Sequence, residues 1–163
     1  MSKSTILAAR SAIGRLTPAQ GDCGKLCGAA CCAPDDEGKG GVYLFPGEEA
    51  LLKDVSWGTV TDTDFAPMLV CRGPCVRSMR PIACRIFPLT PVPNGSGWSA
   101  AVDTRARPIC PLALRLGDLR PDFVRGVRSA IRILASDPDT EAFLRRWAGL
   151  ERRYRDQLEE LLK

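Results

Sequence analysis

The sequence predicts an α+β fold in a single domain of 163 residues: a small, irregular, cysteine-rich core with short strands, followed by a C-terminal αα-hairpin. Eight cysteines fall within one part of the chain, short apolar runs separate them, and the last third has helical periodicity. Leucine, isoleucine, valine and phenylalanine together supply 39 residues, which is enough for a packed core. We expect the core over about 21–112 and the hairpin over about 118–163.

The elements predicted before residue 112 are short. Residues 4–16 form an amphipathic helix, because Ile6, Ile13 and Leu16 fall on one face. The remaining predicted segments are an acidic, glycine-rich loop at 35–41, a strand over 42–45, a helix from Pro46 to about Val55, a strand over 68–70 and a strand over 98–102 that follows a turn at 94–97.

Two helices are predicted in the C-terminal third. The first covers 118–136 and has Pro121 in its first turn, and Asp137 caps the second, which begins at Pro138. The apolar stripe of the second helix consists of Phe143, Trp147, Leu150, Tyr154, Leu158 and Leu161. We expect this stripe to pack on the rest of the domain or on the preceding helix; otherwise the protein is a dimer through its C-terminal helix rather than a monomer.

The charge distribution and the hydropathy limit which cellular compartment and which binding partners are expected. The net charge is +4, and the basic excess lies in the second half of the chain. Nucleic acid is one partner for such a surface, but a solvated helical face explains it better, since no basic run has interleaved aromatic residues. The N-terminus lacks the apolar stretch of a secretory signal, and prolines break the longest uncharged segment, 86–102. We therefore expect a cytoplasmic protein with no membrane partner.

Cysteine is the residue type that carries chemistry here. The chain has no histidine, which excludes histidine-based triads and histidine-ligated metal sites built by this chain alone. Reduced thiols in a cytoplasmic protein favour metal binding over disulfides, inert buried thiols or a catalytic cysteine. All eight cysteines are candidate metal ligands: Cys23, Cys27, Cys31, Cys32, Cys71, Cys75, Cys84 and Cys110.

The spacing of the cysteines leaves the metal open. Three residues separate Cys23 from Cys27 and Cys27 from Cys31, which suits zinc and also an iron–sulfur cluster. Cys110 precedes a proline, as iron–sulfur ligands often do. Side chains of neighbouring residues usually diverge, so Cys31 and Cys32 serve different centres or only one of them is a ligand. Eight thiols fit two four-cysteine sites, or one site with auxiliary cysteines.

Arginines accompany the second cysteine cluster. A site of four thiolates with one zinc ion carries a net negative charge that guanidinium N–H groups can offset by hydrogen bonding to sulfur. Arg80 and Arg85 are therefore candidate cofactor-contacting residues, together with Arg72 and Arg77. An equally weighted alternative is that these arginines are solvated at the protein surface and do not contact sulfur. Three aromatic residues are candidates to shield the sulfur atoms: Tyr43, Phe45 and Phe87.

The cysteine motifs resemble those of the bacterial CxxCxxCC family, whose members are described as zinc- or iron-chelating and often labelled iron–sulfur oxidoreductases. The likeness rests on Cys23, Cys27 and Cys31-Cys32, on the RPIACRIFP segment at 80–88, and on Cys110 as the final cysteine. It covers about 21–112 and departs from the family pattern in having three residues, not two, in each of the first gaps. The resemblance implies a zinc or iron–sulfur cofactor.

Two functions follow as expectations. In the first, the thiolates hold zinc or an iron–sulfur cluster, and a cluster gives the protein an electron-transfer role with a redox partner. In the second, the metal is only a structural staple, and the arginine-rich helices bind a protein or RNA partner. No residue pattern identifies a substrate or a reaction.

Overall fold

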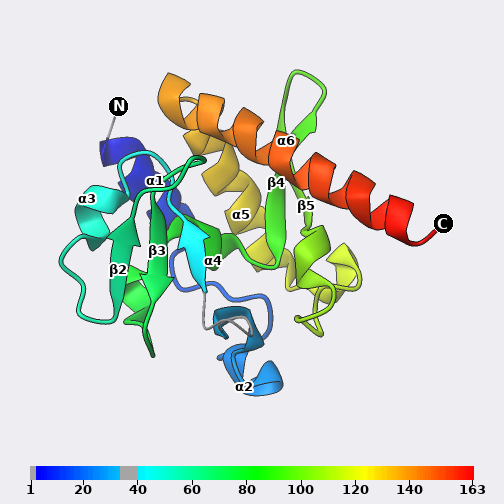
Figure 1. Ribbon diagram of the computed structural model, residues 1–163, viewed down its shortest axis with the longest axis horizontal. Coiled ribbons are helices and arrows are strands. Elements are labelled where there is room, and N and C mark those ends of the chain that lie inside the picture. Colours follow the sequence, from blue (N-terminus) through cyan, green and yellow to red (C-terminus); the bar gives the residue numbers. More distant parts are fainter. Residues whose placement is uncertain (1–2, 34–39) are drawn as a thin grey trace.

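The computed structural model describes residues 3–33 and 40–163 and has the predicted α+β class, with short antiparallel strands and C-terminal helices (Figure 1). Of the predicted acidic loop at 35–41, residues 35–39 lie outside the described residues. The α-helices are α1 (Lys3–Ile13), α2 (Gly24–Cys27), α3 (Glu49–Leu52), α4 (Ile82–Ile86), α5 (Pro121–Leu134) and α6 (Pro138–Leu161). The strands are β1 (Gly41–Tyr43), β2 (Gly58–Thr61), β3 (Met68–Cys71), β4 (Leu89–Asn94) and β5 (Gly97–Val102). Short 3₁₀-helices are η1 (Ala30–Cys32), η2 (Arg77–Met79), η3 (Thr104–Ala106) and η4 (Leu116–Asp118).

The strands form two small antiparallel sheets. In the first sheet β3 lies between β1 and β2, with Met68 opposite both Tyr43 and Thr61. The second sheet is the β4–β5 hairpin, which turns at Gly95, a residue with a φ of +58° that glycine adopts without strain. β1, β3 and β5 lie where strands are predicted, whereas β2 and β4 are additional.

β4 forms in spite of two prolines. Pro91 and Pro93 are two residues apart, so both occupy the same phase of the strand and pair with Ala100 and Trp98. In a two-stranded sheet every strand is an edge, and the ring nitrogens of both prolines can face away from the partner strand. The sequence analysis makes no prediction of secondary structure for residues 89–94.

The N-terminal helix α1 packs against α5, which lies in the last third of the chain. α1 ends at Ile13 rather than at the predicted residue 16, because Gly14 adopts a left-handed φ of +54° that terminates the helix. Gly126 allows α1 and α5 a close approach, since a Cβ there would lie 3.1 Å from the carbonyl oxygen of Ala12 in α1 and 2.7 Å from Leu16 Cδ1. Ile6, Ile13 and Ile131 are at most 1% exposed in the resulting core.

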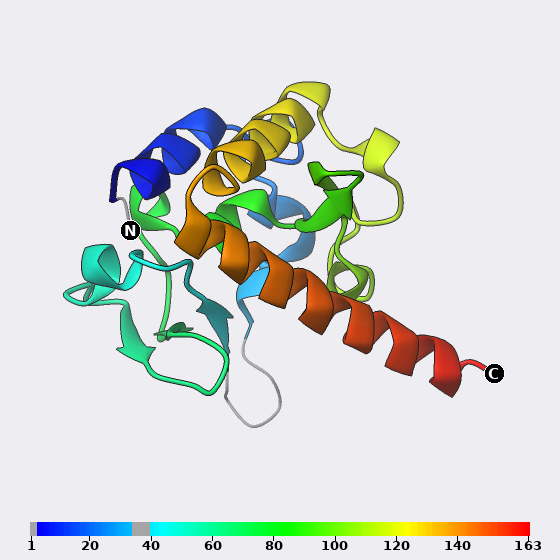
Figure 2. The same cartoon turned by 90° about the horizontal axis from the view of Figure 1, so that it is seen from above.

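The C-terminal helices follow each other through residues 135–137 and then diverge (Figure 2). α5 packs on α1 and β5, whereas α6 crosses β4 and η3. The predicted cap is confirmed, because Asp137 Oδ1 accepts hydrogen bonds from the N–H groups of Asp139 and Thr140 at 3.0 and 3.3 Å. The two helices of the hairpin therefore point in different directions and cover different parts of the domain.

The apolar stripe of α6 is only half covered. Phe143 and Trp147 are buried against Phe45: Phe143 meets its ring edge-on with the centroids 4.8 Å apart, and Trp147 stacks on it at 5.7 Å. The rest of the domain therefore covers the first half of the stripe, as predicted. Tyr154, Leu158 and Leu161 are 39%, 38% and 85% exposed, and this end of α6 projects beyond the other elements (Figure 2).

Candidate metal centre

The cysteines reach one region of the molecule from separate elements. Cys23, Cys27, Cys31 and Cys32 lie in the segment that contains α2 and η1, near the foot of the molecule in Figure 1. Gly28 and Ala29 are both left-handed, with φ of +60° and +58°, and they reverse the chain between Cys27 and Cys31. The remaining cysteines are Cys71 at the end of β3, Cys75 in the following loop, Cys84 in α4, and Cys110 in the loop after η3.

All eight cysteines line two adjoining cavities. The first cavity, of about 670 Å³, is bordered by Cys23, Cys27, Cys31, Cys84 and Cys110. The second, of about 280 Å³, is bordered by Cys31, Cys32, Cys71, Cys75 and Cys84. Cys31 and Cys84 border both cavities, and all eight cysteines are free rather than disulfide-bonded. The eight cysteines therefore border one hollow region of the molecule.

The sulfur atoms are near one another without forming a closed ligand shell. Cys31 Sγ and Cys32 Sγ are 4.0 Å apart, and Cys27 Sγ lies 4.0 Å from the carbonyl oxygen of Cys23. Over residues 3–33 and 40–163, no three cysteine, aspartate or glutamate side chains are arranged tightly enough to hold a metal ion. The structure thus brings the predicted ligands to one place, whereas metal coordination itself remains a prediction.

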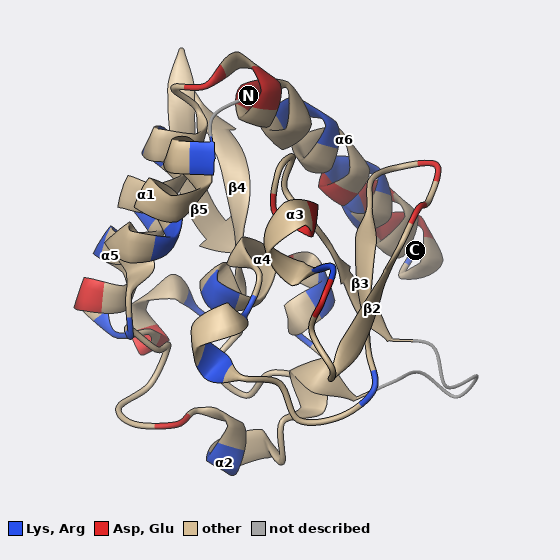
Figure 3. Ribbon diagram, turned by 90° about the vertical axis from the view of Figure 1, so that its left-hand side faces the viewer, with Lys and Arg blue, Asp and Glu red and all other residues tan. Residues whose placement is uncertain are grey.

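Arg80 is the predicted arginine that contacts sulfur. Its Nε donates a hydrogen bond to Cys75 Sγ at 3.2 Å, and its side chain borders both cavities. A guanidinium N–H in this position can offset negative charge at a metal-bound sulfur. Positively charged positions also surround α4 more widely (Figure 3).

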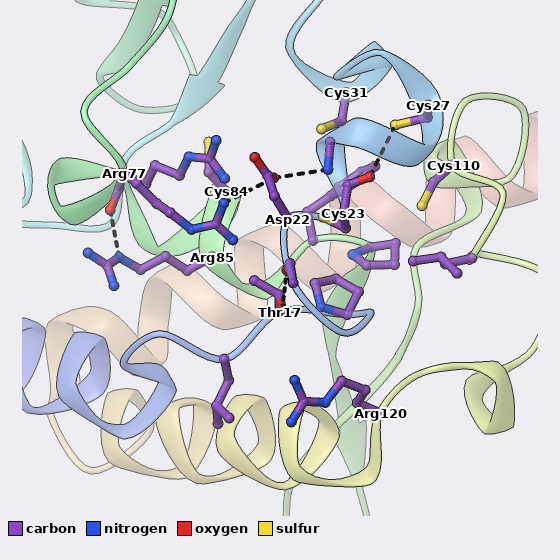
Figure 4. A pocket seen from close by; sticks show the side chains of 18 of the residues that line it. Thr17, Asp22, Cys23, Cys27, Cys31, Arg77, Cys84, Arg85, Cys110 and Arg120 are labelled. Carbon is purple, nitrogen blue, oxygen red and sulfur yellow. Dashed lines mark hydrogen bonds and ion pairs between the residues drawn. The ribbon is translucent and has the colours of Figure 1, made fainter.

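Arg85 and Arg77 contact protein oxygens near the first cavity (Figure 4). Arg85 donates to the carbonyl oxygens of Arg80, Ser78 and Gly14 at 2.8, 2.7 and 3.2 Å. Arg77 pairs with Asp22 at 3.1 Å, and the same Asp22 oxygen accepts the N–H of Gly24 at the start of α2. Arg85 therefore ties α1 to the segment before α4, and Arg77 ties that segment to α2.

The cysteine thiols of the site differ in pKa. Burial, and then the nearby Cys32, Cys71 and Cys75, raise the pKa of Cys84. The hydrogen bond between the Cys31 and Cys32 sulfur atoms lowers the pKa of Cys32 to about 6 and raises the pKa of Cys31. The two thiols of the vicinal pair therefore titrate as a unit.

Phe87 and Tyr43 border the cavities, as predicted for shielding residues. Phe87 lines both cavities and Tyr43 lines the second. The third candidate, Phe45, is fully buried elsewhere, against Phe143 and Trp147. Its role as a shield was therefore wrongly predicted, because the strong aromatic stripe of α6 takes it into the main core.

Glu48 is a positioning residue that the sequence did not single out. Its side chain is fully buried, and its two oxygens accept the N–H groups of Ile82 and Phe45 at 2.8 and 3.1 Å. The bond to Ile82 holds the first turn of α4, the helix that carries Cys84. Burial raises the pKa of Glu48 to about 7, and Arg10 Nη1 lies 3.9 Å from Oε1. The sequence indicates only a helix start at Glu48-Glu49 and does not distinguish the two carboxylates.

Comparison with known proteins finds no matching family model, no matching curated protein and no matching solved structure. The resemblance to the CxxCxxCC family therefore stays a prediction from the cysteine motifs. Among the described residues, no helix is both long and apolar enough to cross a membrane.

Proposed function

We propose that this chain is a cytoplasmic metalloprotein that holds zinc or an iron–sulfur cluster through cysteine thiolates. The observation that carries the proposal is the convergence of all eight cysteines on two adjoining cavities from segments up to 87 positions apart. Packing alone gives no reason for this, since a structural thiol behaves as an ordinary small apolar side chain. The motifs shared with the CxxCxxCC family support the same function.

The donor set fits a thiophilic metal. Sulfur is the only soft donor present, because the chain contains no histidine. Arg80 offers a guanidinium N–H to Cys75 Sγ, which offsets negative charge at the thiolates. When bound, an iron–sulfur cluster supplies one-electron transfer to a redox partner, whereas zinc supplies a redox-inactive anchor for the loops.

The protein's own residues position these thiols. Glu48 holds α4 and hence Cys84, Arg77 and Asp22 hold the start of α2, and Phe87 borders both cavities. The cysteine-bearing loops contain little regular structure, so the free energy of metal binding would also stabilise the local fold.

A second candidate function is an interaction module in which the metal is a staple. The exposed apolar end of α6, formed by Tyr154, Leu158, Leu161 and Leu162, favours it. Both charge signs alternate along α6 (Figure 3), and Arg145 pairs with Glu141 at 2.6 Å, which suits a protein partner better than RNA. Salt-insensitive binding of a protein by metal-free chain supports this second function, and a reversible redox step of a bound chromophore supports the first.

Elemental analysis and a visible spectrum of anaerobically purified protein test the proposal. We expect bound zinc or iron, and we expect Cys84→Ser to lower both the metal content and the melting temperature. Ile86→Val is the matched control, because it removes one buried methylene from α4 but no thiol, so it should lower stability while the metal content stays full. Metal-free wild-type protein with eight reactive thiols contradicts the proposal.

A further inference from the structure

The eight cysteines are not equivalent, because they divide by the cavity they face. Cys23, Cys27 and Cys110 border only the first cavity, whereas Cys32, Cys71 and Cys75 border only the second. Cys31 and Cys84 border both. A four-and-four division therefore depends on where these two cysteines belong.

We propose that the cysteines form two separate four-thiolate metal centres that adjoin at the vicinal pair. This inference rests on the proposed function, since it assumes that metal is bound. The first centre takes Cys23, Cys27, Cys31 and Cys110, and the second takes Cys32, Cys71, Cys75 and Cys84. Four thiolates complete the tetrahedral shell of a zinc ion, and four also complete the shell of a cubane iron–sulfur cluster.

The first centre joins the α2–η1 segment to the loop after η3. Figure 4 shows Cys23, Cys27, Cys31 and Cys110 on one side of the first cavity, with Cys84 on the other side. Backbone hydrogen bonds fix the loop that carries Cys110: its N–H donates to the carbonyl oxygen of Ala106 at 2.8 Å, and its own carbonyl oxygen accepts the N–H of Ala113 at 3.0 Å.

The second centre joins β3, the following loop and α4 to Cys32. Cys84 borders the second cavity together with Cys32, Cys71 and Cys75, and Figure 4 shows it on the side of the first cavity away from Cys27, Cys31 and Cys110. Arg80 lies among these sulfur atoms and donates to Cys75 Sγ at 3.2 Å. Cys84 therefore belongs with the second group, although it also borders the first cavity.

The vicinal pair separates the two groups. Cys31 borders the first cavity together with Cys23 and Cys27, and it also borders the second. Cys32 borders only the second cavity, together with Cys71 and Cys75. Because the two sulfur atoms are only 4.0 Å apart, the two centres are direct neighbours, close enough for electron exchange if both hold iron–sulfur clusters.

Cys31→Ser and Cys32→Ser form a matched pair of variants that tests this division. They make the same chemical change at adjacent, exposed positions, yet the proposal predicts opposite results. Each purified protein is challenged briefly with a chelator, its metal content is measured, and its thiols are alkylated with N-ethylmaleimide and mapped by mass spectrometry. We expect Cys31→Ser to lose about half of the wild-type metal and to expose Cys23, Cys27 and Cys110 to alkylation. We expect Cys32→Ser to lose the other half and to expose Cys71, Cys75 and Cys84.

Cys110→Ser and Cys71→Ser provide a second pair away from the vicinal residues, and far-UV circular dichroism shows whether each variant keeps its helices. This pair should repeat the two patterns. If any single variant releases all metal and exposes every thiol while remaining helical, one shared centre exists and the division is wrong, although the proposed function stands. If Cys31→Ser and Cys32→Ser expose the same subset, the assignment of the pair is wrong. If wild-type protein holds no metal and all eight thiols react, the proposed function itself fails, and the division with it.

Discussion

Replacing Glu48 with glutamine should remove a large part of the pH dependence of stability. The carboxyl group is fully buried, and burial raises its pKa from an ordinary 4.5 to about 7. The folded protein therefore binds a proton more tightly than the unfolded chain does. The resulting stabilisation is complete below about pH 4.5 and is lost as the pH rises through about 7, where the buried carboxylate must ionise.

The expected size follows from the same pKa difference. One pKa unit corresponds to about 1.4 kcal/mol, so the shift amounts to about 3 kcal/mol in the free energy of unfolding, most of it between about pH 5 and about pH 8. Glutamine cannot ionise, but it retains one oxygen for the N–H of Ile82 and presents an amide NH₂ to the N–H of Phe45. Glu48→Gln should consequently cost roughly 1–3 kcal/mol at low pH and much less at high pH.

Urea unfolding of the wild type and Glu48→Gln at several pH values measures this difference. Using the difference between the two proteins cancels the contribution of thiols that titrate in the same range. Glu159→Gln is the control, because its side chain is exposed near the end of α6 and should leave the pH profile unchanged. Parallel stability profiles of wild type and Glu48→Gln between about pH 5 and about pH 8 would refute the reasoning.

Two further predictions concern helix packing and thiolate charge. Gly126→Ala should lower the free energy of unfolding by roughly 1–3 kcal/mol, because its Cβ would lie 2.7 Å from Leu16 Cδ1. Gly149→Ala is the control: its Cβ meets nothing within 4 Å, so it should raise the free energy of unfolding by up to about 1 kcal/mol. Equal changes in the two melting temperatures would contradict the close α1–α5 contact. Arg80→Met should release metal to a chelator roughly tenfold faster than Arg72→Met, because only Arg80 of this pair donates to a cysteine sulfur in the structure. Equal release rates would show that the Arg80 hydrogen bond does not stabilise bound metal.

The sequence was most informative where local physics decides the structure. α6 begins at its predicted residue and α5 begins three residues after its predicted start, because Pro121, Pro138 and the Asp137 cap act on the first turn alone. The sequence was least informative where the conformation of a segment depends on pairing with another segment. β4 and β2 become strands by pairing with β5 and β3, and neither pairing has a strong local signal.

In the candidate site, too, some features can be predicted from local sequence and others depend on the fold. Motif spacing names the cysteines and four nearby arginines as candidates, but it does not tell which arginine contacts sulfur or how the cysteines divide into groups. Thirty-eight positions separate Cys32 from Cys71, and loops of that length can close in many ways. Glu48 escaped notice because its burial depends on α4, which begins 34 positions later.

The kind of chemistry available to this protein follows from composition alone. A chain with eight cysteines and no histidine can offer a soft metal only sulfur, whatever shape it adopts. Which sulfur atoms face each other, and which carboxylate is withdrawn from water, depend on the three-dimensional packing of α2, β3, α4 and the loop after η3. Donor type is a property of single residues, whereas proximity between distant segments exists only once the core has formed.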